Sequence, residues 1–131
     1  TMSDDGVPLR KEHLLPVLLQ SCPSFRPEDP EQPTYILLGE FAEHLLERQR
    51  AGATEELLAA VRLIERLHVE GDAYVREATT IGILEAILNI SGWSGLDAEA
   101  FGQYLLPVSR RWWDSLHAFW SGKIAHIGAG L

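Results

Sequence analysis

The spacing of hydrophobic residues predicts a chain of helices. In residues 35–50, and again in residues 54–70, apolar side chains recur every three or four positions and so line one side of a helix. The first stripe consists of Leu38, Phe41, Ala42, Leu45 and Leu46, and the second of Leu57, Val61, Ile64 and His68. Ala51-Gly52 is expected to end the first helix, and the hydroxyl group of Thr54 is expected to cap the second.

Residues 73–90 differ from both stretches, because their apolar side chains leave no polar side. A surface helix keeps a polar face, whereas a helix without one needs cover from several directions. Gly71 ends the preceding helix, and Asp72 is expected to cap this one. We therefore expect residues 73–90 to form the central helix, with Arg76 reaching solvent and Glu85 finding a polar partner at the edge of the buried part.

Prolines and glycines separate the remaining elements. Four prolines in residues 22–33 exclude a helix there and predict an acidic, extended loop. We expect this loop to be an ordered strap on the surface, and a partner-binding segment is the alternative. The other predicted elements are a helix over 8–21 kinked at Pro16, a break over 91–95, a short helix over 97–106 closed by Pro107, a helix over 109–120 and an irregular tail over 121–131.

The fold class that follows is all-α, since no stretch alternates in the manner of a β-strand. Thr1 precedes Met2 and reads as the remnant of a tag, so residues 2–131 are taken as a single domain. Short turns join the helices that start near residues 35, 54 and 72, and short connections make antiparallel neighbours. The sequence predicts one stack or bundle of five or six helices.

Two sets of residues carry a resemblance to known families. Asp72, Val75 and Arg76, in the pattern D-x-x-V-R, resemble the second helix of a HEAT repeat, in which the Asp and the Arg join neighbouring repeats. The run from YILLGEFAEHL through GILEAILN to YLLPVSRRWWDSLHAFW resembles an uncharacterised bacterial family of small, acidic, all-helical proteins. These resemblances imply a HEAT-like helical fold, and they bring no catalytic residues with them.

The charge balance indicates which classes of molecule the protein is expected to bind. Nineteen Asp and Glu residues against eleven Lys and Arg residues give a formal net charge of −8. Positive charge drives binding to nucleic acids and to anionic membranes, so we expect neither as a partner, and a basic protein fits better. Cys22 is the single cysteine, and no apolar run reaches the ~18 residues of a membrane span, so a cytoplasmic location is expected.

Carboxylates and histidines occur in the order that di-iron bundles use, but helical phase argues against a metal. The residues concerned are Glu40, Glu65, His68, Glu85, Asp114 and His117. At about 100° per residue, Glu40 and Asp114 lie about 150° and about 160° from the apolar stripes of their own helices, so neither points into the core. His68 does face the core, where a lone histidine usually makes one hydrogen bond. We expect no metal and no cofactor.

Two surfaces remain as candidate binding sites. The first is an acidic face on the helix over 35–50, made by Glu40, Glu43, His44 and Glu47. It is either a solvated surface or the contact for a partner. The second is an aromatic set on the helix over 109–120, made by Trp112, Trp113, Phe119 and Trp120 around Leu116. We expect these aromatic side chains to close the core, and the alternative is an interface such as that of a homodimer.

The leading hypothesis for function is a module that binds another protein through the acidic face. Its concrete form is a bacterial immunity or antitoxin-like protein that covers a basic toxin. The alternative is a helical-repeat enzyme or nucleic-acid-processing protein of the HEAT-like type, which would need a basic groove. The basic doublets are Arg10-Lys11 and Arg110-Arg111, and no spaced motif joins a nucleophile to a base, so the sequence leans away from an enzyme.

Overall fold

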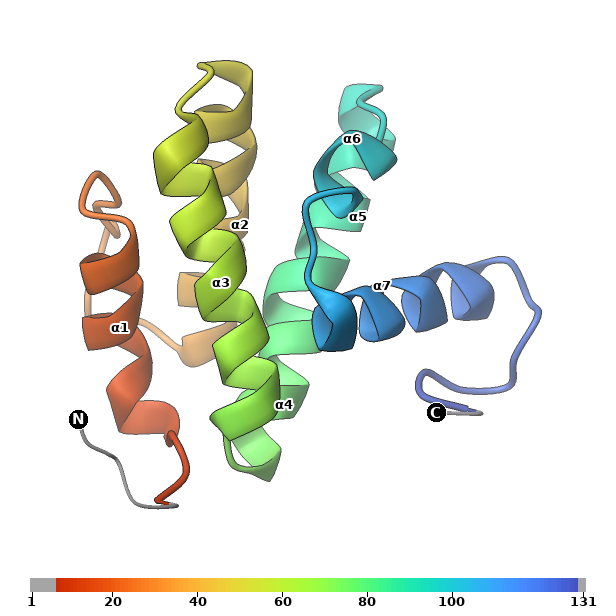
Figure 1. The fold of residues 1–131 in the computed structure, drawn as a ribbon, viewed down its shortest axis with the longest axis horizontal. Coiled ribbons are helices and arrows are strands. Elements are labelled where there is room, and N and C mark those ends of the chain that lie inside the picture. Colours follow the sequence, from red (N-terminus) through yellow and green to blue (C-terminus); the bar gives the residue numbers. More distant parts are fainter. Residues whose placement is uncertain (1–6, 130–131) are drawn as a thin grey trace.

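The computed structural model describes residues 7–129, and the fold is all-α (Figure 1). The outermost residues of the domain predicted over 2–131 lie outside this described part. The helices are α1 (Leu14–Ser21), α2 (Thr34–Arg50), α3 (Thr54–Glu70), α4 (Ala73–Ala78), a π-helical segment (Thr79–Leu84), α5 (Glu85–Ser94), α6 (Glu99–Gly102) and α7 (Pro107–Trp120). Because α4, the π segment and α5 run on as one helix, the described chain holds six helices, within the predicted number.

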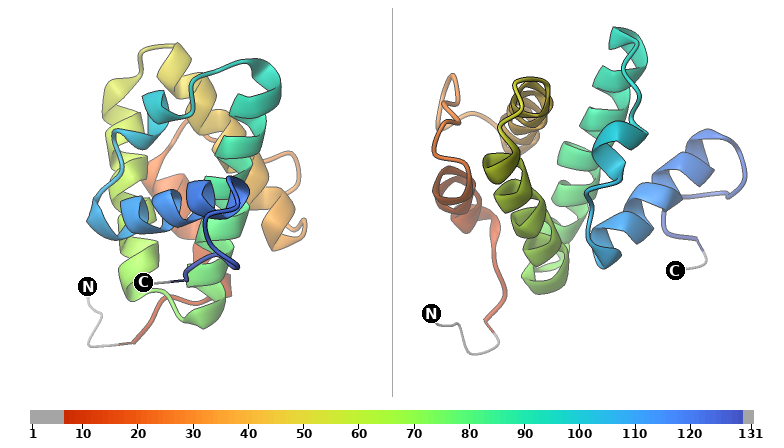
Figure 2. Two further views of the ribbon diagram at one scale, coloured as in Figure 1. Left: turned by 90° about the vertical axis from the view of Figure 1, so that its right-hand side faces the viewer. Right: turned by 45° about the horizontal axis from the view of Figure 1, so that its top comes forward.

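The continuous helix from Ala73 to Ser94 lies at the centre of the molecule, as predicted (Figures 1 and 2). The π segment contacts α2, α3 and α7, while α1 packs against α3 on the outer side. Leu84 and Ile87 are fully buried, and Arg76 is exposed as expected. The expected partner of Glu85 is not found within residues 7–129, and the residue is half-buried rather than enclosed.

The end of the central helix differs from the prediction. The break predicted over residues 91–95 is wrong for residues 91–94, because α5 continues to Ser94. Gly95 then adopts the left-handed φ of 72°, and the N–H group of Leu96 donates to the carbonyl of Ser91. A left-handed glycine with such a bond is a common helix end. The helix therefore ends four residues later than its composition predicts.

The first helix starts later than predicted. Lys11–His13 form a 3₁₀ turn, and α1 follows from Leu14 without interruption to Ser21. Pro16 therefore stands in the first turn of α1, where a backbone N–H group has no partner within the helix. The predicted kink is wrong, because proline in this position costs no hydrogen bond.

Of the two side-chain caps predicted from the sequence, one is present in the structure. The Oδ1 atom of Asp72 accepts a hydrogen bond from the N–H group of Val75 at 2.9 Å, so this predicted cap is confirmed. Thr54 is not a cap, because it is already the first residue of α3 and its hydroxyl lies 3.4 Å from the carbonyl of Gly52. Pro107 opens α7, where its missing N–H group costs nothing.

Two stretches contain no helix, as predicted. They are residues 22–33, which we call the strap, and residues 121–129 of the tail. The short helix predicted over 97–106 is reduced to α6, with turns after it. Among the described residues, no helix combines the length and the apolar character that crossing a membrane requires.

Candidate functional site

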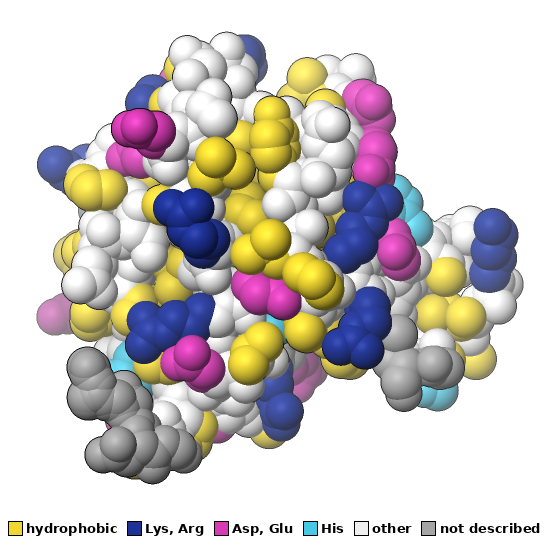
Figure 3. Space-filling model, viewed as in Figure 1, with side chains coloured by type: hydrophobic (Ala, Val, Ile, Leu, Met, Phe, Trp, Pro, Cys, Tyr) yellow, Lys and Arg dark blue, Asp and Glu magenta, His cyan; other side chains and the backbone are white. Residues whose placement is uncertain are grey.

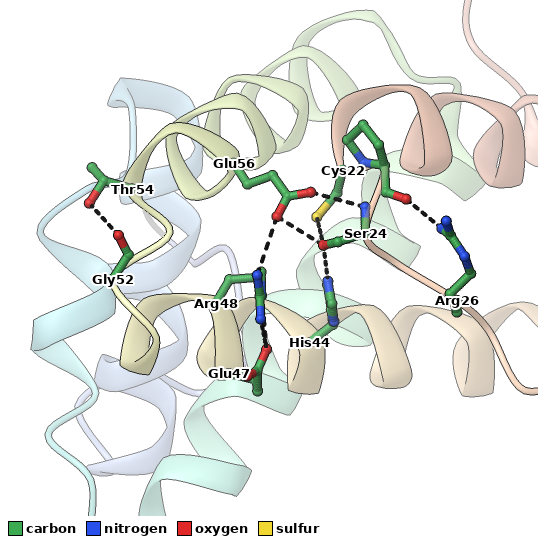
Figure 4. Close-up of polar contacts among 10 residues, drawn as sticks. Cys22, Ser24, Arg26, His44, Glu47, Arg48, Gly52, Thr54 and Glu56 are labelled. Atoms are coloured by element: carbon green, nitrogen blue, oxygen red, sulfur yellow. Dashed lines mark hydrogen bonds and ion pairs between the residues drawn. The ribbon is translucent and has the colours of Figure 1, made fainter.

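A cluster of polar side chains ties the strap to α2 and α3 (Figure 4). Ser24 of the strap lies at its centre. The two carboxylate oxygens of Glu56 on α3 accept hydrogen bonds from the Ser24 hydroxyl at 2.8 Å and from the Ser24 backbone N–H at 3.0 Å. The Ser24 hydroxyl also lies 2.8 Å from Nε2 of His44 on α2. Since the one hydroxyl proton goes to Glu56, the Nε2–H group of His44 donates to Ser24.

The pKa values in this cluster follow from burial and from these bonds. Burial lowers the pKa of His44, assisted by the charge of Arg48, so the imidazole is held neutral. Burial alone would raise the pKa of Glu56, but the two hydrogen bonds from Ser24 and the nearby Arg48 outweigh it and lower that pKa. The cluster is therefore a neutral histidine and an ionised glutamate joined by a serine.

This cluster contains the residue types that bind metal ions and that carry out thiol chemistry. Cys22 Sγ, a ring nitrogen of His44 and a carboxylate oxygen of Glu56 lie within 4.8 Å of one another, and these are residue types that hold zinc. However, Ser24 already hydrogen-bonds to both His44 and Glu56, and Arg48 lies 3.8 Å from Glu56. Burial raises the pKa of Cys22, so the thiol stays protonated. The arrangement fits an anchor for the strap better than a reactive centre.

The residues of the predicted acidic face have different roles in the structure. Glu40 accepts hydrogen bonds from the Glu28 backbone N–H at 3.1 Å and from the Gln32 side chain at 2.9 Å, so it also holds the strap. His44 is engaged by Ser24, as described above. Glu47 forms an ion pair with Arg48 at 2.8 Å, whereas Glu43 is exposed. The face is thus partly structural and partly available to solvent.

A hollow of about 550 Å³ lies between the strap and this side of α2. Its lining consists of Phe25, Arg26, Glu28, Glu40, Glu43, His44, Glu47 and Arg50. Four carboxylates face two guanidinium groups, which leaves two net negative charges because His44 is neutral. The structure therefore brings all four predicted residues to one hollow, and it adds residues of the strap, which the sequence alone does not place beside them.

The predicted aromatic set is divided between the core and the surface. Trp113 is fully buried, Trp112 and Phe119 are half-buried, and Trp120 is 58% exposed. The Trp113 ring lies 6.0 Å from the ring of Phe101, between their centroids. Trp113 thus closes the core as expected, while Trp120, near the end of α7 that projects from the bundle in Figure 1, does not.

A second polar network joins α3, the π segment and α7. Glu65 accepts hydrogen bonds from the backbone N–H groups of Val108 and Ser109 at 3.0 and 2.9 Å, and from the Ser109 hydroxyl at 2.9 Å. It thereby caps the N-terminus of α7 from another helix. Nδ1 of His68 lies 2.8 Å from the Ser109 hydroxyl, and Nε2 lies 3.0 Å from the Thr80 hydroxyl. His68 makes two hydrogen bonds, one more than expected.

The hydrogen bonds and the burial of this network indicate a structural role. Ser109 donates its proton to Glu65, so the hydroxyl accepts from Nδ1–H of His68. The free nitrogen Nε2 then accepts from the Thr80 hydroxyl at 3.0 Å, which is nearer than the other acceptor of that hydroxyl, the Arg76 carbonyl at 3.3 Å. The fully buried Ser109 cannot present a nucleophilic oxygen to a substrate. Burial lowers the pKa of His68 to about 4, so its imidazole is neutral near pH 7.

The buried His68 predicts a loss of stability on mild acidification. Its pKa is 6.5 unfolded and about 4 folded, so its contribution is complete above pH 6.5 and is lost as the pH falls toward 4. Between pH 7 and pH 5 this amounts to about 2 kcal/mol. Urea denaturation at both pH values is expected to show this loss in the native protein and a correspondingly smaller loss in His68→Gln.

His44 supplies the control for this experiment, since its pKa is also lowered in the fold and its contribution falls in the same direction. It is less buried than His68, so His44→Gln is expected to reduce the pH dependence by a smaller amount. Identical pH dependence in the native protein and His68→Gln would contradict the assignment of a neutral, buried His68.

Fold and site together define a small all-helical protein whose strap is anchored to α2 and α3 by polar contacts. The chain belongs to a family described as a domain of unknown function (DUF7674), whose model matches residues 15–121. The predicted membership of an uncharacterised family is confirmed. Neither the curated proteins nor the solved structures gave a match.

Proposed function

We propose that this protein is an interaction module that binds a basic protein through the hollow between the strap and α2. The observation that carries the proposal is the charge of that hollow, where Glu28, Glu40, Glu43 and Glu47 outnumber two arginines. The ring of Phe25, which is 2% exposed, adds a small apolar edge to the wall of the hollow beside these carboxylates. A lysine or arginine side chain has a matching form, with an apolar stem and a cationic end.

The electrostatics favour such a partner at long range as well. The net charge of −8 attracts a basic protein and repels nucleic acid, and complementary charge raises the rate of association. Anchoring by Ser24 and Glu40 fixes the strap against α2 and α3, so a partner would meet a preformed surface. A preformed surface loses less conformational entropy on binding than a mobile loop does.

The finer form of the proposal is a bacterial immunity or antitoxin-like protein that acts in the cytoplasm and covers a basic toxin. It includes a HEAT-like arrangement for α2, α3 and the central helix, whose short connections and mutual contacts support it. Stacked helical repeats bind partners on surfaces that the stack leaves exposed, since each hairpin only has to bury the sides that face its neighbours.

The test is affinity capture from the source organism, followed by binding measurements with the captured partner. Glu43→Lys reverses the one exposed carboxylate of the acidic face that has no ion pair or hydrogen bond among the described residues. We expect the association rate to fall about tenfold, because charge at the rim of an interface acts mainly on association.

Glu12→Lys is the matched control, since it changes the net charge equally at an exposed glutamate outside the hollow. It is expected to change the association rate by less than about twofold. Equal effects of both substitutions, or a partner without basic character, would contradict binding through the hollow. Turnover of a small molecule by the purified protein, with no partner captured, would reject the interaction module itself.

A further inference from the structure

A second cavity lies on another side of the molecule, where α3, the central helix and α7 meet. Its volume is about 650 Å³, which is within the range of about 300–1,000 Å³ that small-molecule sites occupy. Figure 3 views the molecule from the side of Figure 1. Hydrophobic side chains gather near the centre of this face, with an acidic side chain among them and Lys and Arg side chains around them. None of the residues of the hollow beside α2 lines this cavity.

The walls of the cavity are largely apolar. Ile81 of the π segment, Val108 and Trp112 of α7, and Ile127 of the tail contribute to them. Trp112 is half-buried, and its ring packs so closely against Gly128 that a Cβ atom there would lie 2.9 Å from it. The indole is therefore held in place before any ligand arrives, which suits it to contact an aromatic or aliphatic body.

The polar groups of the cavity are few and unequally engaged. His68 and Thr80 line it, but they hydrogen-bond to each other. Arg76 is exposed and forms no ion pair with any carboxylate of residues 7–129. Its guanidinium group is thus free to bind an anion through charge-assisted hydrogen bonds. Glu77 also lines the cavity and would repel a second negative charge on the same ligand.

The backbone supplies an independent observation. Thr80 and Ile81 belong to the π segment, in which the N–H group of Glu85 donates to the carbonyl of Thr80 five residues earlier. π-helical turns are rare and occur frequently at functional sites. Here the unusual turn directs residues toward α7 and forms one wall of the cavity.

From these features we propose that the cavity binds a small organic molecule with one anionic group and an apolar, ring-containing body. Arg76 binds the anionic group at the rim, and the body lies against Trp112, Ile81 and Val108. Repulsion by Glu77 disfavours a polyphosphate. This site is separate from the hollow beside α2, so it stands whether or not that hollow binds a protein.

Two fluorescent probes test the proposal, because they share one ring system and differ in charge. 8-Anilinonaphthalene-1-sulfonate carries a sulfonate, and N-phenyl-1-naphthylamine is its neutral counterpart. Titration of the full chain is expected to show saturable binding of the sulfonate at one site. Arg76→Gln should weaken binding of the sulfonate about tenfold and binding of the neutral probe by less than about twofold.

Ala73→Phe and Arg62→Gln complete the experiment. Ala73 is exposed at the first position of α4 and lines the cavity, so a phenyl ring there fills the cavity from outside and should weaken both probes about tenfold. Arg62 is an exposed arginine of α3 outside the cavity, and Arg62→Gln should leave both affinities unchanged. Thermal melts check that the variants are folded. Affinities for both probes that are unchanged in Arg76→Gln and in Ala73→Phe would overturn the proposal.

Discussion

Trp113→Ala is expected to lower the free energy of unfolding by about 3–5 kcal/mol, the cost of removing a large aromatic side chain from a core. The Trp113 side chain is 0% exposed and packs beside Phe101. It also lies against α6, where a Cβ atom added to Gly102 would clash with the indole nitrogen. Because the packing is so close, the surrounding residues cannot readily move into the cavity that the substitution leaves. Urea denaturation measures the loss.

Trp120→Ala is the matched control, because it removes the same side chain from the same helix. Trp120 is 58% exposed, so its replacement should change the free energy of unfolding by about half a kcal/mol or less. Comparable losses in the two variants would mean that α7 is buried along its whole length, contrary to the structure.

Leu84→Ala is expected to cost about 2–5 kcal/mol. Leu84 is fully buried and ends the π segment, which α2, α3 and α7 enclose. Truncation leaves a cavity between several helices, which cannot all move inward together. Glu43→Ala, on the exposed side of α2, should change the free energy of unfolding by less than about half a kcal/mol. Small, equal shifts of the melting temperature in both variants would show that the central helix is not enclosed.

The helices that the sequence predicts well are those whose burial is one-sided or complete. The stripe from Leu38 to Leu46 marks the buried face of α2, and the apolar residues after Asp72 mark the enclosed helix. Both patterns are local, because a helix brings residues three and four apart onto one face. Asp72 is predictable for the same reason, since a cap acts within one turn.

The polar anchors could not be predicted, because their partners are distant in the sequence. Ser24 and Glu56 are 32 residues apart, and Ser109 and Glu65 are 44 residues apart. No local sequence pattern predicts such a pair. The sequence pairs Glu65 with His68 in the spacing of a metal site, whereas in the structure Glu65 caps α7.

The burial of the aromatic set could be predicted only in part from the sequence. Periodicity places Trp113 and Trp120 on a common face of α7, but it does not say how far along the helix that face is covered. Because α7 projects beyond the central helix in Figure 1, this face is buried at Trp113 and Leu116 but exposed at Trp120. Depth of burial depends on the neighbouring elements, and these are set by the tertiary fold.

The π segment also constrains how the length of the chain can change. A π turn holds one residue more than an α turn, so loss of one residue from Thr79–Leu84 could restore regular α-helical hydrogen bonds. A residue in a π turn rotates the helix by less than the ~100° of an α-helical residue, so the same deletion would leave α5 in nearly its present orientation. Ile87 and Ser91, both now buried, would keep the positions in which they pack. The π segment is therefore the part of this helix at which the loss of one residue disturbs the packing of α5 least.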